Sequence, residues 1–347
     1  MRSSLLFLIC LLQAGCAIAQ LSTVDSVSKK PAGFTGSVSM PLSTKYRASP
    51  AEEFFWGKHY RKEWGTTVSF PILDMKTFKG GLTPDELGGG HQSKSLRVIA
   101  GDGKEYVLRT VEKDLTPLVP EGLRGTFIHH RANDQLSMIH PYGALIVARL
   151  AEKIPIFHMN PEILFVPNTD DLKEFRDSIG NKLCYFEERP GGKGWEHSEI
   201  AGNAEKIEST EDIVEKFAKD TKHRIDQEGF LKARLFDMVI NDFDRHEDNF
   251  DWAKFSKRNP SGEKDSIVLY KVFPKDRDHA LSRVDGLLMH FISQPWALRP
   301  LENINKRVKD VLGQNFAARN LDRQFLNQLT KDEWRDAISN LQSALTN

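Results

Sequence analysis

A run of charged residues between two apolar segments constrains the fold of this chain most strongly. The run follows the apolar stretch 230–241 and contains Asp242, Asp244, Arg245, His246, Glu247 and Asp248. The spacing of the apolar residues before it predicts a helix, so the run forms a polar loop where that helix ends. Within the loop, Asp244 and Asn249 have the spacing D-x-x-x-x-N, which can hold a carboxylate and an amide oxygen near each other. A solvated turn that only carries surface charge is the alternative interpretation.

A second apolar segment delivers two more carboxylates about thirty residues later. The stretch 268–274 (VLYKVFP) predicts a buried strand, and Asp276 and Asp278 follow its end. Asp276 can also form an ion pair with Arg245 or Arg277. The order of helix, polar loop and strand therefore predicts a site where carboxylates from two segments meet.

A glycine-rich turn lies earlier in the chain. Gly88, Gly89 and Gly90 are followed by Gln92 and Lys94. Because glycine has no side chain, the backbone N–H groups of such a turn can approach phosphate oxygens closely. A plain flexible loop is the alternative, since runs of glycine commonly form one.

Two predicted strands, 95–100 and 105–111, follow the glycines. The sequence Gly101-Asp102-Gly103 between them is typical of a hairpin turn. Arg109 and Lys113 lie on or just after the second strand, where either side chain could neutralise phosphate charge. The segment 182–190 (KLCYFEERP) predicts a further buried strand that ends at Glu187 and Glu188.

The order of predicted elements indicates an α+β fold with two lobes. Strands and a helix from His140 to Lys153 come first, and mostly helices follow. Ser209 with Asp212, and Thr330 with Glu333, predict capping boxes that begin two of these helices. We expect a small β-rich N-lobe over residues 50–186 and a mainly helical C-lobe over residues 187–347. The last helix has no obvious C-terminal cap, so we expect the chain to be a truncated product.

The first nineteen residues predict a secretory signal peptide. Arg2 precedes an apolar run from Leu5 to Leu12, and Ala17-Ile18-Ala19 offers a cleavage site. Ala14-Gly15-Cys16 also resembles a bacterial lipoprotein box, so lipidation of Cys16 is the alternative to cleavage after Ala19. Residues 20–49 are rich in Ser, Thr, Lys, Pro and Gly, which predicts a flexible arm. No later segment is apolar enough to predict a membrane span.

Composition argues against a protein that binds nucleic acid through its overall charge and against a fold held together by internal disulfides. The 48 Lys and Arg residues balance 48 Asp and Glu residues, so bulk electrostatics do not favour binding to nucleic acid. After cleavage of the leader, Cys184 is the one cysteine left, and it cannot form an internal disulfide. The fold must therefore depend on its apolar core.

Taken in order, these motifs resemble the atypical protein-kinase-like superfamily over about residues 80–285. The nearest patterns are those of the HipA-like kinases, the phosphatidylinositol kinases and the secretory-pathway kinases. Gly90, Gln92 and Lys94 resemble the G-x-Q-x-K signature of the phosphate-covering loop in HipA-like proteins. The chain also looks like a kinase-related module of secreted bacterial outer-membrane proteins.

The resemblance implies roles for particular residues. Asp244 would be the catalytic base, and Asn249 and Asp278 would bind Mg²⁺. Asp278 fits the metal site better than Asp276, because a small residue follows it two positions later. Residues that would bind ATP are those of the glycine turn, the following basic residues and the 187–189 hinge: Gly88, Gly89, Gly90, Gln92, Lys94, Arg109, Lys113, Glu187 and Glu188.

The function implied is an exported kinase-like domain that binds Mg·ATP and phosphorylates an unknown acceptor. The alternative is an inactive pseudokinase that acts as a nucleotide-binding or assembly module of the cell envelope. Two substitutions motivate that alternative: Arg109 stands where the family carries a lysine, and the helix after His140 offers only a late acid, Glu152. We expect no nucleic acid partner, and membrane attachment only through Cys16 or a following domain. We expect the protein in the periplasm, in the outer membrane or at the surface of a bacterial cell.

Overall fold

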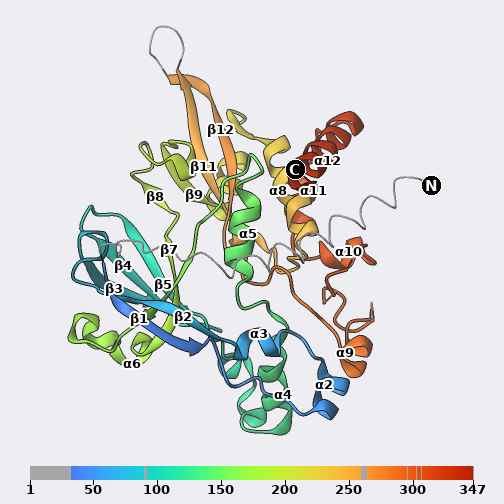
Figure 1. Cartoon of the computed structure of the whole chain (residues 1–347). Coiled ribbons are helices and arrows are strands. Elements are labelled where there is room, and N and C mark those ends of the chain that lie inside the picture. The colour runs from blue at the N-terminus through green and yellow to red at the C-terminus, as the bar shows by residue number, and fades with distance from the viewer. Residues whose placement is uncertain are drawn as a thin grey trace.

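The computed structural model describes residues 33–89, 92–258, 264–294, 296–301, 303–305 and 307–346. The predicted leader and Gly90 lie outside the described residues, as do residues 20–32 of the predicted arm. The described chain has two lobes, each with its own sheet (Figure 1). This confirms the expected two-lobed α+β fold.

The N-lobe is built on a seven-stranded sheet in the order β1-β2-β6-β7-β5-β4-β3. Its strands are β1 (Phe34–Pro41), β2 (Thr67–Leu73), β3 (Leu82–Gly88), β4 (Ser95–Ala100), β5 (Glu105–Thr110), β6 (Glu162–Val166) and β7 (Lys182–Glu188). The predicted hairpin is confirmed, because β4 and β5 pair antiparallel and the N–H of Gly103 donates to the carbonyl of Ala100. Alternate residues of the two strands are buried, as the two-residue period of a strand requires: Leu96, Val98, Ala100, Tyr106 and Leu108.

The expectation of a flexible arm over residues 20–49 is wrong for its second half. Residues 34–41 form β1, an edge strand that pairs antiparallel with β2. The side chains of β1 alternate between partly buried and exposed positions, and Val38 and Met40 pack against the core. Its serines occupy exposed positions of an edge strand, which the polar composition of this segment does not prevent.

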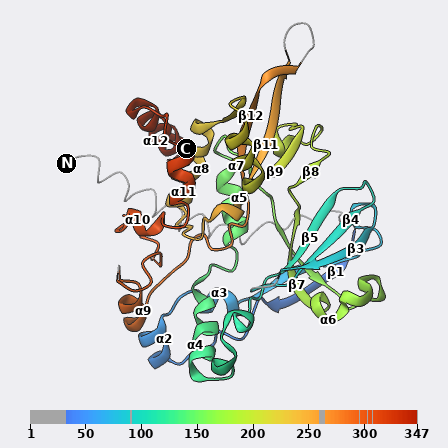
Figure 2. The same ribbon diagram turned by 180° about the vertical axis from the view of Figure 1, so that it is seen from behind.

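Short helices flank the N-lobe sheet: α2 (Pro50–Trp56), α3 (Arg61–Gly65), α4 (Phe127–Gln135), α5 (Gly143–Ala151) and α6 (Arg176–Ile179). The helix predicted after His140 is confirmed as α5. Its residues Val147 and Ala151 belong to the same buried cluster as Phe230 and Phe236 of the C-lobe, so α5 packs between the two lobes. Figures 1 and 2 show α5 at the centre of the molecule in both views.

The C-lobe contains a five-stranded sheet as well as helices. The strand order is β10-β12-β11-β9-β8, formed by β8 (Gly192–Lys193), β9 (Lys206–Ser209), β10 (His223–Ile225), β11 (Phe250–Arg258) and β12 (Lys264–Pro274). Its helices are α7 (Thr210–Lys219), α8 (Gln227–Val239), α9 (Leu287–Ile292), α10 (Val311–Gln314), α11 (Arg319–Phe325) and α12 (Lys331–Thr346). Both predicted capping boxes are present, at Ser209 before α7 and at Thr330 before α12.

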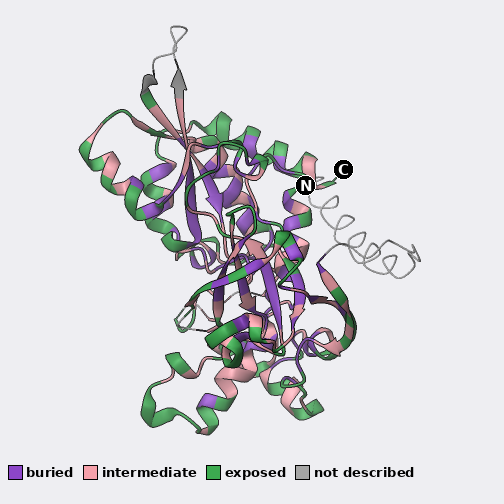
Figure 3. Cartoon of the chain, turned by 90° about the vertical axis from the view of Figure 1, so that its left-hand side faces the viewer, coloured by how far each residue is buried: buried purple, intermediate pink, exposed green. Residues whose placement is uncertain are grey.

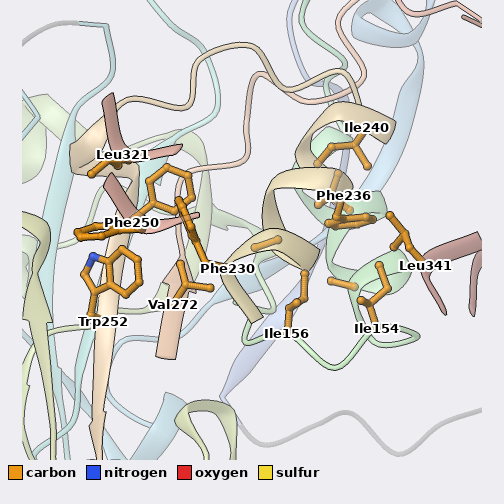
Figure 4. Packing of buried hydrophobic residues seen from close by; sticks show 14 of the residues in the cluster. Ile154, Ile156, Phe230, Phe236, Ile240, Phe250, Trp252, Val272, Leu321 and Leu341 are labelled. Atoms are coloured by element: carbon orange, nitrogen blue, oxygen red, sulfur yellow. The ribbon is translucent and has the colours of Figure 1, made fainter. Parts of the chain in front are cut away.

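The C-lobe core joins α8 to the two long strands. Phe230 and Phe236 of α8 are both fully buried, and Phe230 packs against Phe250 and Trp252 of β11 (Figure 4). A large side chain buried in this way stabilises the fold by about 1.5–3 kcal/mol. Buried positions follow the strands of both sheets, whereas the helices at the lower end of the molecule are mostly exposed or half-buried (Figure 3). Among the described residues, no helix is both long and apolar enough to cross a bilayer.

Candidate active site

A cleft of about 710 Å³ collects side chains from both lobes. Strands β4, β5 and β7 form one wall, and the loops 244–249 and 275–279 form the other. Nine of the predicted site residues line it: Gly89, Gln92, Arg109, Lys113, Glu187, Glu188, Asp244, Asn249 and Asp278. Segments that are far apart in the sequence therefore meet at one site.

The polar loop leaves α8 through Asn241, whose φ of 52° turns the chain sharply. Arg245 then holds the loop in place. Its guanidinium is buried, and it donates to the carbonyls of Asn249 at 2.9 Å and Lys275 at 2.7 Å. It therefore fastens the D-x-x-x-x-N loop to the segment that carries Asp278.

A buried carboxylate on α8 supports Arg245. Asp237 accepts from Arg277 at 2.9 Å and from Arg234 at 2.9 Å, and its oxygen lies 3.3 Å from Nε of Arg245. Burial opposes ionisation of this carboxyl, but the three arginines hold its pKa below the ordinary value. Asp237 therefore binds an arginine from each of the two loops that line the cleft, Arg245 and Arg277.

Asn249 is oriented by a hydrogen bond within the loop. Its side-chain amide donates to the backbone carbonyl of Asp244, which leaves the amide oxygen as the group that can bind a cation. The backbone carbonyl of Asn249 also accepts from the N–H of Lys275 at 3.0 Å. The spacing D-x-x-x-x-N thus closes a short loop, as the sequence predicted.

Asp276 and Asp278 occupy different environments. The carboxylate of Asp276 forms an ion pair with Arg109 at 2.5 Å, and not with Arg245 or Arg277, the partners that the sequence left open. Arg245 instead contacts the backbone carbonyl of Asp276, and Arg277 binds Asp237. The carboxylate of Asp278 lies 2.8 Å from Nζ of Lys113.

Positive groups determine the charge state of Asp278. Burial opposes its ionisation, but Lys113, His279 and Arg109 outweigh that effect and hold its pKa below the usual range. Arg109 also lies 3.1 Å from Glu187, whose pKa is raised by burial. Both candidate cations, Arg109 and Lys113, therefore reach the cleft, and Lys113 is the nearer of the two to the candidate metal ligand Asp278.

Glu152 is not the acidic partner of either cation. It forms a surface ion pair with Arg149 at 2.7 Å. Among the described residues, the acidic partners of Arg109 and Lys113 come from β7 and from the 276–278 segment.

Lys94 does not line the cleft, so the structure does not bring it together with the other expected phosphate contacts. The backbone of Lys94 pairs with Thr110, and both residues line a separate, smaller cavity. The neighbouring pair, Ser95 and Arg109, faces the cleft. Gly88 is the last residue of β3 and pairs with Ser95 without lining the cleft.

His279 belongs to the site although the sequence argument did not single it out. Its Nε2 lies 3.2 Å from Nζ of Lys113 and 3.6 Å from the carboxylate of Asp244. Burial and the charge of Lys113 lower the pKa of the His279 imidazole. The only sequence signal was its position directly after Asp278.

The oxygen groups of the cleft suit Mg²⁺ bound together with phosphate. No group of three or more His, Cys, Asp or Glu side chains among the described residues is arranged to hold a metal. Mg²⁺ at nucleotide sites is instead bound by one or two protein oxygens together with phosphate and water. Asp278 and the amide oxygen of Asn249 provide that set, so the residues present fit the cofactor.

The chain is similar to several solved structures, among them two of one kinase and one of another. The chain is similar to the Rio2 kinase–ADP/Mg²⁺-phosphoaspartate complex from Chaetomium thermophilum, with 12% identity and a TM-score of 0.34, covering 77% of this chain and 66% of that one. A second Rio2 structure from the same organism gives 11% identity and a TM-score of 0.33, covering 77% and 67%. The Helicobacter pylori proinflammatory kinase CtkA gives 12% and 0.29, covering 76% and 91%. No family model and no curated protein matches the chain.

Proposed function

We propose that this protein is an atypical kinase that binds Mg·ATP in the cleft and transfers the γ-phosphoryl group to a hydroxyl acceptor. The observation that carries the proposal is the convergence of Asp244, Asn249 and Asp278 on one cleft with Arg109 and Lys113. Phosphoryl transfer needs little covalent chemistry from a protein. It depends on positioning and on neutralising charge, which this set of groups can supply.

Each group has a role that its place in the cleft supports. Asp244 accepts the proton of the acceptor hydroxyl through its carboxylate. The acceptor oxygen then bonds to the γ-phosphorus as the bond from that phosphorus to the β–γ bridging oxygen breaks, and ADP leaves. Lys113 and Arg109 neutralise phosphate charge. Asp278 and Asn249 would hold Mg²⁺, which neutralises developing charge on the phosphate oxygens when it is bound.

A pseudokinase is the second candidate, and one observation favours it. Arg109 and Lys113 both form ion pairs with carboxylates of the cleft, Asp276 at 2.5 Å and Asp278 at 2.8 Å. Nucleotide must displace these pairs before the cations can bind phosphate. A chain that binds nucleotide without rearranging them would not catalyse transfer.

Titration with Mg·ATP tests nucleotide binding, and labelled ATP tests transfer. Binding stabilises a folded protein, so we expect the melting temperature to rise with Mg·ATP and to rise much less in Asp278→Asn. Transfer of label to the protein itself or to a mixed protein acceptor should disappear in Asp244→Asn. The matched control is Glu247→Gln, an exposed acid of the same loop that does not line the cleft. Binding without transfer selects the pseudokinase, and absence of binding refutes both candidates.

We also propose that the chain is exported as part of a bacterial envelope protein. The support is the Arg2, apolar and Ala17-Ile18-Ala19 pattern of the sequence. N-terminal sequencing of the secreted product distinguishes cleavage before Gln20 from a product that begins at lipidated Cys16. An unprocessed N-terminus would refute export by either route.

A further inference from the structure

A second cavity of about 380 Å³ shares part of its wall with the cleft. We call it the lysine pocket. Its walls come from the end of β1, the segments on either side of β4 and β5, and the start of β7, and they include Lys45, Gln92, Lys94, Glu112, Lys113 and Lys182. Its volume falls in the range of cavities that hold small ligands.

The pocket gathers more positive than negative charge. Four lysines face two carboxylates, and Lys113 is already bound to Asp278 of the cleft. Lys45 forms an ion pair with Glu112 at 2.5 Å. Lys182 has no carboxylate partner among the described residues. Its Nζ donates instead to the backbone carbonyl of Ser178 at 2.6 Å, which does not neutralise its charge. Its positive charge therefore remains available to the pocket.

Lys94 carries the clearest unpaired charge. Within the described part of the chain, its Nζ forms no ion pair and no hydrogen bond, while its backbone is fixed by two bonds to Thr110. A strand-anchored ammonium at the rim of a cavity can bind an anion without any backbone rearrangement.

An unsatisfied polar atom lies in the wall that the lysine pocket shares with the cleft. The side-chain oxygen of Gln92 is buried and has no hydrogen-bond partner in the described structure, although Gln92 lies in the wall of the pocket. An unpartnered buried acceptor is costly, and a ligand that carries a hydroxyl or a protonated oxyanion would satisfy it.

We propose that the lysine pocket binds a small oxyanion ligand, a phosphate or carboxylate group, at a site separate from the nucleotide cleft. Lys94, Lys182 and Lys45 are the cations that recognise it, and Gln92 accepts a hydrogen bond from its hydroxyl. This site does not depend on the proposed kinase function, because none of these three lysines lines the cleft.

The shared wall couples the two sites. Gly89, Gln92, Ser93 and Lys113 line both cavities. An anion in the lysine pocket competes with Asp278 for the ammonium of Lys113, and weakening that ion pair frees the carboxylate on the cleft side. Because linkage is reciprocal, the factor by which the oxyanion changes the Kd for Mg·nucleotide should equal the factor by which Mg·nucleotide changes the Kd for the oxyanion.

Calorimetric titration of the protein with sodium phosphate at constant ionic strength tests the site, and a parallel titration with succinate distinguishes a phosphate from a carboxylate ligand. We expect saturable binding of at least one of them. Lys94→Glu should raise its Kd at least tenfold, and this exposed side chain has no described partner whose loss would unfold the protein. The matched control, Lys153→Glu, changes an exposed lysine near the end of α5 and should keep the Kd within twofold.

Three results would overturn the proposal. The first is that neither anion binds saturably, and the second is that Lys153→Glu weakens binding as much as Lys94→Glu does. The third is displacement of the bound anion by a saturating non-hydrolysable Mg·ATP analogue, because the anion would then occupy the cleft. If the protein binds no nucleotide at all, the proposed kinase function fails. The comparison of Lys94→Glu with Lys153→Glu then still tests whether the lysine pocket binds an oxyanion.

Discussion

The ammonium of Lys113 lies 2.8 Å from the carboxylate of Asp278, across the cleft between the two lobes. Lys113 follows a strand of the N-lobe sheet, whereas Asp278 follows β12 of the C-lobe sheet. The pair therefore joins the two lobes at the position where phosphate and metal would bind. Its side chains are largely buried, so water screens it little.

Replacing Lys113 tests the importance of this pair. Within the described structure, Lys113→Met leaves Asp278 with only the longer contacts to Arg109 at 4.0 Å and His279 at 3.8 Å. We expect the Kd for Mg·ATP to rise at least tenfold and the melting temperature to fall, because a buried carboxylate loses its nearest partner. The control is Lys219→Met, which removes an exposed helical ion pair with Glu215. Unchanged nucleotide affinity in Lys113→Met would assign phosphate binding to Arg109 instead.

Arg245 provides a test of how the loop from Asp244 to Asn249 is held. Arg245→Met removes a buried guanidinium that binds the carbonyls of Lys275 and Asn249 and leaves Asp237 with one arginine fewer. Loss of one partner from a buried charge network costs about 3–5 kcal/mol, to be measured by urea denaturation. The control, Arg335→Met on exposed α12, should cost less than about 1 kcal/mol. Similar losses in the two variants would contradict the role assigned to Arg245.

The sequence predicted which segments meet at the cleft better than it predicted which side chains of those segments face it. The spacing of Asp244 and Asn249 is local, and one short loop satisfies it. Lys94 and Arg109 were both expected at phosphate, yet they point to opposite faces of the sheet because Lys94 pairs with Thr110 and Ser95 pairs with Arg109. A shift of one residue in strand register reverses the face, and a single sequence does not show that register.

The sequence also did not predict contacts between distant segments. Arg109 and Asp276 are 167 positions apart, and nothing in either segment indicates that they pair. The strand β1 was missed for a different reason. Its polar residues lie on the exposed side of an edge strand, where the composition resembles that of a flexible arm.

Gly89 and Gly103 form a matched pair for testing the glycine-rich loop. Both have positive φ, 78° and 83°, so Gly→Ala should cost each about 1–2 kcal/mol of backbone strain. An added Cβ at Gly89 would lie 2.5 Å from the carbonyl oxygen of Ser93, whereas at Gly103 it meets nothing within 4 Å. We therefore expect Gly89→Ala to lower the melting temperature more than Gly103→Ala does, and to be the one of the two variants that raises the Kd for Mg·ATP. An equal change in nucleotide affinity would show that the loop does not contact phosphate.

Asp242 should make stability depend on pH in an unusual direction. Burial raises the pKa of its carboxyl to about 7, and neither oxygen has a hydrogen-bond partner in the described structure, although Arg245 lies 3.6 Å away. An unfolded Asp has a pKa of about 3.9, so between about pH 4 and pH 7 the folded protein binds more protons than the unfolded one. The contribution of Asp242 to the free energy of unfolding therefore falls as pH rises through this window. Above pH 7 the folded protein bears the full cost of burying the ionised carboxylate.

Asp242→Asn removes this titration. A tenfold difference in proton affinity between the folded and unfolded states corresponds to about 1.4 kcal/mol, so the variant should gain stability relative to the wild type as pH rises from about 4 to about 8. Urea denaturation at several pH values measures the difference, and Asp332→Asn, an exposed acid of α12, should show no such trend. A stability difference that stays constant across this pH range would mean that Asp242 is ionised throughout, because its attraction to Arg245 then outweighs the cost of burying its charge.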